Sequence, residues 1–195
     1  MLKRWKTVVP AVLFLGILGC GGLRYSEASP EAQDFHPRRV AILPADSMAF
    51  AGAGSDVDRL FFEALSERKW FADVVGGEAI GRRLKSDEAF RQVVTDYLAK
   101  LANVSFSDPA LSGRIGELTG AEAFLLVQVD YWNHTVENEK KIAKVSLTIR
   151  MIEVKTGKIL WMAVHHKISD YLIIKPELSD VARDLIREMI GYMPH

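Results

Sequence analysis

A strict alternation of apolar and polar residues from Lys144 to Met151 is the feature that most restricts the fold of this chain. The apolar set consists of Val145, Leu147, Ile149 and Met151, and the polar set consists of Lys144, Ser146, Thr148 and Arg150. Successive side chains of a β-strand point to opposite faces, so the pattern predicts a strand with one buried and one wet face. Such a strand belongs to a sheet that has its main core on one side.

Two further predicted strands flank this one in the sequence. The segment from Ala123 to Trp132 is strongly apolar, and a polar stretch from Asn133 to Glu139 predicts a turn after it. The segment from Ile159 to Ile168 follows a second turn that contains Gly157, a residue type that adopts positive φ without strain. The three segments together predict an antiparallel meander.

Amphipathic helices are predicted both before and after the meander. Apolar residues recur every three or four positions after Ser55, between Asp87 and Ala102, after Asp108 and after Pro176. Short β-favouring segments at 40–43 and 71–75 add two more strands. We therefore predict an α/β sandwich, in which helices cover a mixed, largely antiparallel sheet of about five strands.

The first 20 residues resemble a bacterial lipoprotein signal. Three bases in the first six residues precede Val8 to Leu18, an apolar run of about 16 Å as a helix, which is too short for a bilayer core of about 30 Å. The run ends in Ile17-Leu18-Gly19-Cys20, which resembles a lipobox. This resemblance implies cleavage before Cys20, an S-diacylglyceryl group on its thiol, and an N-acyl group such as palmitate. A plain signal peptide and an uncleaved anchor remain the alternatives.

This reading divides the chain into three parts. Residues 1–19 form the signal peptide, residues 20–37 form a flexible tether rich in Gly, Ser, Glu and Pro, and residues 38–195 form a periplasmic α/β domain. Gly21 stands where an aspartate marks retention in the inner membrane of enterobacteria. The resemblance therefore implies the outer membrane, with the inner membrane as the alternative.

Three segments of the domain resemble the curli-secretion (CsgG-type) lipoprotein superfamily, whose relatives include the TolB N-terminal domain and the penicillin-binding-protein activator lipoprotein. They are Val40 to Pro44, Leu118 to Ala123, and Ile152 to Trp161. The resemblance implies a periplasmic domain that contacts other proteins and is not an enzyme. The strands that would have to form a transmembrane hairpin are already needed for the core, so we do not predict that this chain forms a pore by itself.

Composition and motifs indicate little chemistry. The chain has 25 basic and 25 acidic residues, which gives no reason to expect nucleic-acid binding. Its single cysteine excludes an intrachain disulfide and a thiolate zinc cluster. The adjacent His165 and His166 are expected on opposite faces of a strand, and Gly52-Ala53-Gly54 lacks the remainder of a phosphate-binding loop. We predict no catalytic residue, metal, small-molecule substrate or cofactor, apart from the covalent lipid at Cys20.

Three functional hypotheses follow. The first is an outer-membrane lipoprotein with a protein-interaction domain in envelope assembly, secretion or cell-wall synthesis, and the second is a self-assembling secretion-pore accessory. The third is a periplasmic hydrolase, which requires a deep polar pocket with at least two convergent titratable groups. Trp132 and Trp161 are candidate interface residues, because aromatic residues are enriched at interface centres, and the core is their alternative location.

Overall fold

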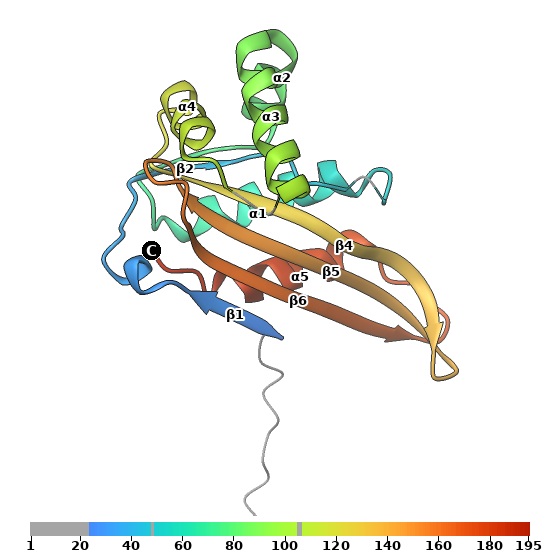
Figure 1. The fold of residues 1–195 in the computed structure, drawn as a ribbon. Helices are drawn as coiled ribbons and strands as arrows, with labels where there is room; N and C mark the ends of the chain where they lie inside the picture. The colour runs from blue at the N-terminus through green and yellow to red at the C-terminus, as the bar shows by residue number, and fades with distance from the viewer. Residues whose placement is uncertain (1–23, 48, 105–106) are drawn as a thin grey trace, which may run out of the picture.

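A computed structural model describes residues 24–195 apart from 48 and 105–106. In this part of the chain six strands form one mixed sheet with helices on both faces (Figure 1). The elements are β1 (Tyr25–Ala28), η1 (Pro30–Gln33), β2 (Arg39–Ile42), α1 (Ala53–Arg68), β3 (Asp73–Val75), α2 (Glu78–Ser86), α3 (Glu88–Val104), α4 (Pro109–Thr119), β4 (Ala123–Glu137), β5 (Lys140–Glu153), β6 (Ile159–Tyr171) and α5 (Leu178–Ile190). The predicted α/β fold with a largely antiparallel sheet is confirmed, with six strands in place of about five.

The strand order is β1-β6-β5-β4-β2-β3. β2 pairs in parallel with β3 and β4, whereas β4, β5, β6 and β1 pair antiparallel. The predicted meander is therefore present, and its strands of 15, 14 and 13 residues are unusually long. At about 3.4 Å per residue they extend about 45 Å.

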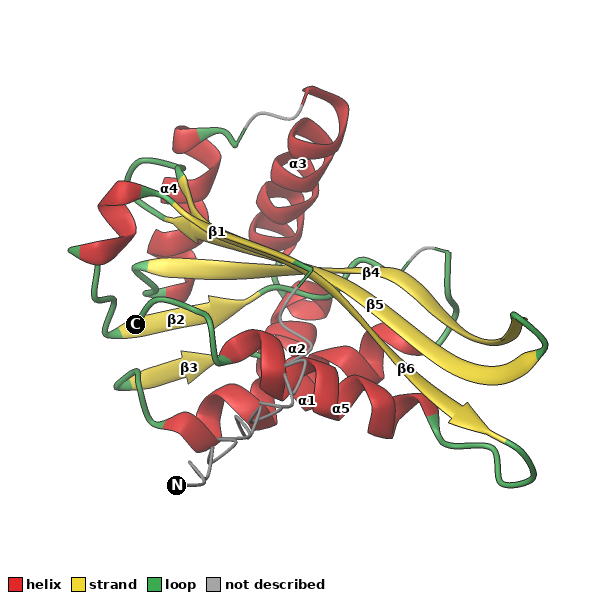
Figure 2. Cartoon of the chain, turned by 90° about the horizontal axis from the view of Figure 1, so that it is seen from below, coloured by secondary structure: helices red, strands yellow, loops and turns green. Residues whose placement is uncertain are grey.

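The helices α1 and α5 cover one face of this sheet, and Figure 2 shows them on the opposite side from α3 and α4. The predicted apolar set of β5 is buried here together with the apolar stripe of α5, which is Val181, Ala182, Leu185, Ile186, Met189 and Ile190. The prediction that one face of β5 is buried is thus confirmed. This larger core also contains Leu125 and Val127 of β4.

The helices α2, α3 and α4 cover a smaller area of the opposite face. Phe90, Tyr97 and Ile115 pack on Phe124 and Leu126 near the start of β4, and the rings of Tyr97 and Phe124 meet edge-on at 5.1 Å. The strand residues of this second core do not extend past Leu126 in β4. The remainder of the meander consequently lacks a helix on this side (Figure 1).

The ends of α4 follow the local rules that its sequence predicts. The Asp108 carboxylate accepts hydrogen bonds from the backbone N–H groups of Ala110 at 2.8 Å and Leu111 at 3.1 Å. Pro109 opens the helix, where its missing N–H has no cost. Gly120 ends the helix with φ of 69°, which a side chain would strain.

The predicted flexible tether over residues 20–37 is wrong for residues 25–33. Residues 25–28 form β1 on the free edge of β6, and Ala32 of η1 is buried. Glu31 also forms an ion pair with Lys158 at 2.6 Å. A sheet edge pairs through backbone groups, so the polar sequence of β1 did not need an apolar pattern to join it.

The predicted turn from Asn133 to Glu139 is also too long. β4 continues to Glu137, and the turn consists of Asn138 and Glu139, both with positive φ. Glu137 pairs with Lys140 in the register of β4 and β5. Strands pair through backbone groups and do not need apolar side chains. These polar residues therefore stay in the sheet beyond the covering helices.

No helix in the described residues has the combined length and apolarity needed to cross a bilayer. The predicted signal segment from Val8 to Leu18 and the predicted lipidation site at Cys20 lie outside the described residues. Their predicted roles therefore remain predictions.

Packing of α5 on the meander yields a first test. Leu185→Ala removes a fully buried side chain and should lower the free energy of unfolding by about 2–5 kcal/mol. The matched variant Arg183→Ala removes only a solvent-exposed ion pair with Asp180 and should cost less than about 1 kcal/mol. Urea unfolding of both variants measures this difference, and equal losses would contradict the assigned core.

Candidate interaction surface

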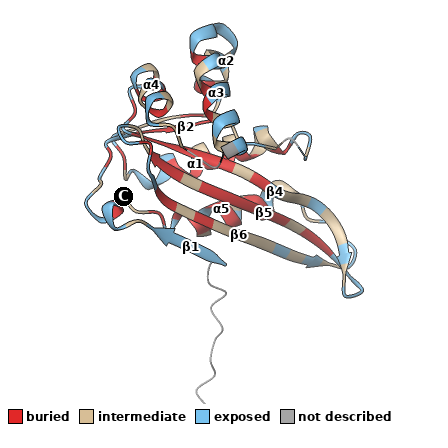
Figure 3. Cartoon of the chain, in the orientation of Figure 1, coloured by how far each residue is buried: buried red, intermediate tan, exposed pale blue. Residues whose placement is uncertain are grey.

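One face of the outer meander is uncovered by the described helices, and we call it the open face. In β5 and β6 its members alternate with residues of the α5 core and pair with one another across the two strands. They are Lys144, Ser146, Thr148, Arg150, Met162, Val164, His166 and Ile168. Figure 3 shows this side of β5 and β6 without a helix in front of it. The strand β1 extends the surface, because Tyr25 lies opposite Val164.

The open face combines apolar and cationic side chains. Met162 and Val164 are half-buried, and Ile168 and Tyr25 are each 40% exposed. A strand that is apolar on both faces is typical of a sheet whose second face is also covered. Here no helix of the described chain supplies that cover, so the apolar side chains of this face are available for contact with another molecule.

Hydrogen bonds and ring contacts hold the polar side chains near the open face in place. Thr148 Oγ1 donates to Asp130 Oδ2 at 2.8 Å, and partial burial raises the pKa of this carboxyl despite that bond. The Lys144 ammonium lies 5.4 Å from the Tyr131 ring centroid and 2.7 Å from Glu137 Oε1. Side chains fixed in this way lose less conformational entropy when a partner binds.

The two adjacent histidines contact different parts of the fold. His165 Nε2 lies 3.3 Å from Glu188 Oε1 of α5, and its Nδ1 accepts the backbone N–H of Arg24 at 3.0 Å. His166 lies opposite Ser146 on the open face. Burial lowers the pKa of His166, and the nearby charges of His165, Lys144 and Arg24 lower it further.

The structure separates the two candidate interface tryptophans. Trp161 is only 1% exposed, belongs to the α5 core, and donates its indole N–H to Ser26 Oγ at 3.0 Å. The interface prediction is therefore wrong for Trp161, and its core alternative is correct. Trp132 is half-buried and packs against the same core, so its interface role remains a prediction.

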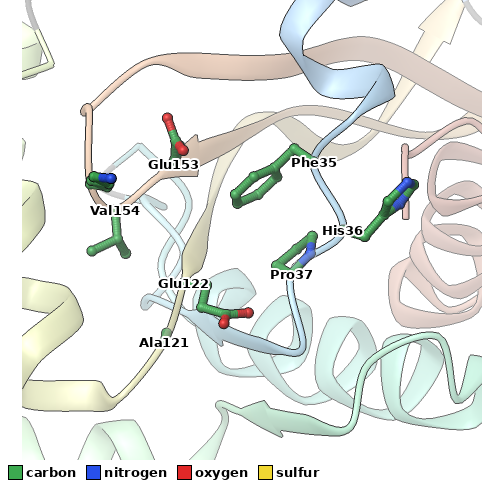
Figure 4. A pocket seen from close by; sticks show the side chains of 8 residues that line it. Phe35, His36, Pro37, Ala121, Glu122, Glu153 and Val154 are labelled. Carbon is green, nitrogen blue, oxygen red and sulfur yellow. The ribbon is translucent and has the colours of Figure 1, made fainter.

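A shallow pocket of about 360 Å³ lies elsewhere, where the segment before β2 meets the β5–β6 turn. The Glu122 carboxylate accepts the backbone N–H of Arg38, and the Glu153 carboxylate accepts the Thr156 hydroxyl. Figure 4 shows that the two carboxyl groups do not point toward one another. The polar groups of this pocket therefore hold the local fold and do not form the convergent pair that a hydrolase needs.

Metal-ligating side chains are scattered over the fold. Among the described residues no group of three or more His, Cys, Asp or Glu side chains is placed to hold a metal ion. His36 lines the shallow pocket and its Nδ1 lies 3.1 Å from the His195 backbone oxygen. His134 lies near the far end of β4 and contacts the segment that follows β6.

Comparison with known proteins places the fold. No family model and no curated protein matches the sequence. The fold is similar to the PelC dodecamer from Paraburkholderia phytofirmans, with a TM-score of 0.54, 14% identity, and coverage of 87% of this chain and 95% of that one. It is also similar to the hypothetical protein CT253 from Chlamydia trachomatis, with a TM-score of 0.55, 10% identity, and coverage of 78% and 93%.

The lipoprotein GNA1162 from Neisseria meningitidis also matches, with a TM-score of 0.49, 16% identity, and coverage of 80% of this chain and 99% of that one. At these identities the likeness concerns the fold alone, and the resemblance to the curli-secretion superfamily remains a prediction.

The environment of His166 predicts a pH dependence. Its folded-state pKa lies below the usual value of about 6.5, so the unfolded chain takes up the proton first as the pH falls. Stability should therefore be lost below about pH 7, and His166→Gln should lose less between pH 7.5 and pH 5.5 than the unaltered protein. Urea unfolding at the two pH values measures this, and an identical loss in both proteins would exclude the assigned environment.

Proposed function

We propose that this chain is an outer-membrane lipoprotein whose periplasmic domain binds another envelope protein through the open face. The observation that carries the proposal is a sheet face with Met162, Val164 and Ile168 exposed or half-buried and no covering element in the described chain. Uncovered apolar area of this kind on a folded domain marks a contact site.

The location rests on the N-terminal segment. Ile17-Leu18-Gly19-Cys20 supplies the small residue before the cleaved bond and a thiol to carry the diacylglyceryl group. One acyl chain anchors a protein only marginally, whereas the three chains implied by the lipobox resemblance anchor it permanently. Gly21 supports the outer membrane as the destination.

Binding suits the described geometry better than catalysis does. In the shallow pocket both carboxylates are occupied by bonds that stabilise the fold. The open face instead has apolar side chains with polar side chains around them, and protein interfaces combine an apolar centre with a polar rim. Roles in envelope assembly, secretion or cell-wall synthesis all need such a domain, and we propose this general role without enzymatic activity.

Self-assembly is the second candidate, since the occupant of the open face can be another copy of this chain. The solved PelC structure is a dodecamer, and this chain shares its fold over 87% of its length. Most soluble oligomers are symmetric assemblies of identical chains. This candidate corresponds to a secretion-pore accessory.

Site-specific crosslinking in cells tests both candidates. A photoreactive phenylalanine at Val164, on the open face, should give one discrete adduct after illumination. The same residue at Arg82, an exposed position on α2, should give at least several-fold less. An adduct of twice the chain mass identifies self-assembly, and any other discrete mass identifies a partner protein. A folded, membrane-bound protein with no adduct at Val164 would overturn the proposal.

A further inference from the structure

Three consecutive aliphatic side chains between β6 and α5 are almost fully exposed. Leu172, Ile173 and Ile174 are 90%, 92% and 85% exposed, and Val136 of β4 is 63% exposed at the same end of the meander. We call these four residues the apolar tip. Figure 2 shows the segment after β6 looping out past the end of that strand before it returns to α5. Soluble domains rarely leave contiguous aliphatic residues in water without a binding role.

His134 contacts the chain on both sides of this segment. His134 Nε2 lies 2.8 Å from the Pro176 carbonyl oxygen, and its ring meets the Tyr171 ring edge-on at 5.9 Å. These contacts fix the chain just before and just after the three aliphatic residues. The backbone of this segment is therefore held in place while its three aliphatic side chains stay exposed.

The charges around the apolar tip are largely paired. Lys140 forms an ion pair with Asp170 at 3.5 Å, and Lys144 forms one with Glu137. Lys175 and Glu177 also follow the tip within a few residues. With both signs interspersed, this end of the molecule has no strong field toward an anionic surface, so apolar contact dominates its binding.

The described chain begins at the edge of the sheet. Its first residue, Arg24, donates its backbone N–H to His165 in the middle of β6. Cys20 precedes Arg24 by four residues, a reach of at most about 14 Å. The strand from His165 to Tyr171 covers about 20 Å. An anchor at Cys20 therefore holds this edge of the sheet within about 14 Å of the bilayer, with the apolar tip about 20 Å or more further along β6.

We propose that the apolar tip inserts into the lipid bilayer that holds the Cys20 anchor, which gives the domain a second membrane contact. This inference rests on the proposed anchoring at Cys20. A bilayer accepts a protruding aliphatic segment without a shaped groove, and the lysine stems nearby can extend to the headgroup level. Because the reach from Arg24 to Cys20 is shorter than the span from His165 to Tyr171, both contacts form when the β1–β6 edge of the sheet lies toward the membrane.

Fluorescence quenching in vesicles tests this inference. The chain from Cys20 to His195, with its single cysteine, is coupled to a maleimide-headgroup lipid in zwitterionic vesicles. The variants Ile173→Trp and Lys155→Trp place a reporter at the apolar tip and at the opposite end of β5. Vesicles with brominated acyl chains should quench the added fluorescence of Ile173→Trp at least twofold more than that of Lys155→Trp. Adding anionic lipid should change this little.

Equal quenching of the two variants would overturn the inference. Dimerisation through the tip would overturn it as well, because a second copy would then occupy the tip. Light scattering would show this as concentration-dependent dimers of the uncoupled chain that are absent in the triple variant Leu172→Ser, Ile173→Ser, Ile174→Ser. The chemical coupling replaces native lipidation. If the tip inserts into these vesicles but Cys20 is not acylated in cells, the proposed function is wrong and the membrane contact of the tip still stands.

Discussion

One-sided packing of α5 against the long antiparallel meander determines the rest of this structure. The apolar stripe of α5 meets the buried set of β5, and both belong to the same face of the sheet. The helices on the other face reach only the start of β4, where Phe124 and Leu126 end the second core. The strands are longer than the helices that cover them. The open face and the apolar tip both follow from this mismatch in length.

The strand β6 connects these two features. Its residues alternate between the α5 core and the open face, so that Ala163 is buried while Val164 is presented on the other side. Beyond Tyr171 the same chain continues into Leu172, which is almost fully exposed. Contacts of the bilayer with the Cys20 anchor and with the tip would hold the β1–β6 edge of the sheet toward the membrane. The apolar tip and the open face consist of different residues, so the two proposed contacts use different surfaces.

Local patterns predicted much of the fold and little of the candidate surface. The alternation in β5 and the Asp108 cap of α4 are short-range signals, and both were confirmed because nothing in the tertiary structure opposes them. The strand β1 was missed because edge pairing uses backbone groups and leaves no apolar pattern. The place of Val164 on the open face was not predicted, since its exposure depends on where distant helices end. Trp161 was offered as a contact residue, but the arrival of β1 completes its burial.

The proposed membrane attachment depends most on a lipid at Cys20, and intact mass spectrometry of the protein extracted from bacterial membranes measures this directly. The account predicts a chain that begins at Cys20 and carries the added mass of a diacylglyceryl group and an N-acyl chain. A chain that retains residues 1–19 and has an unmodified Cys20 thiol would contradict it.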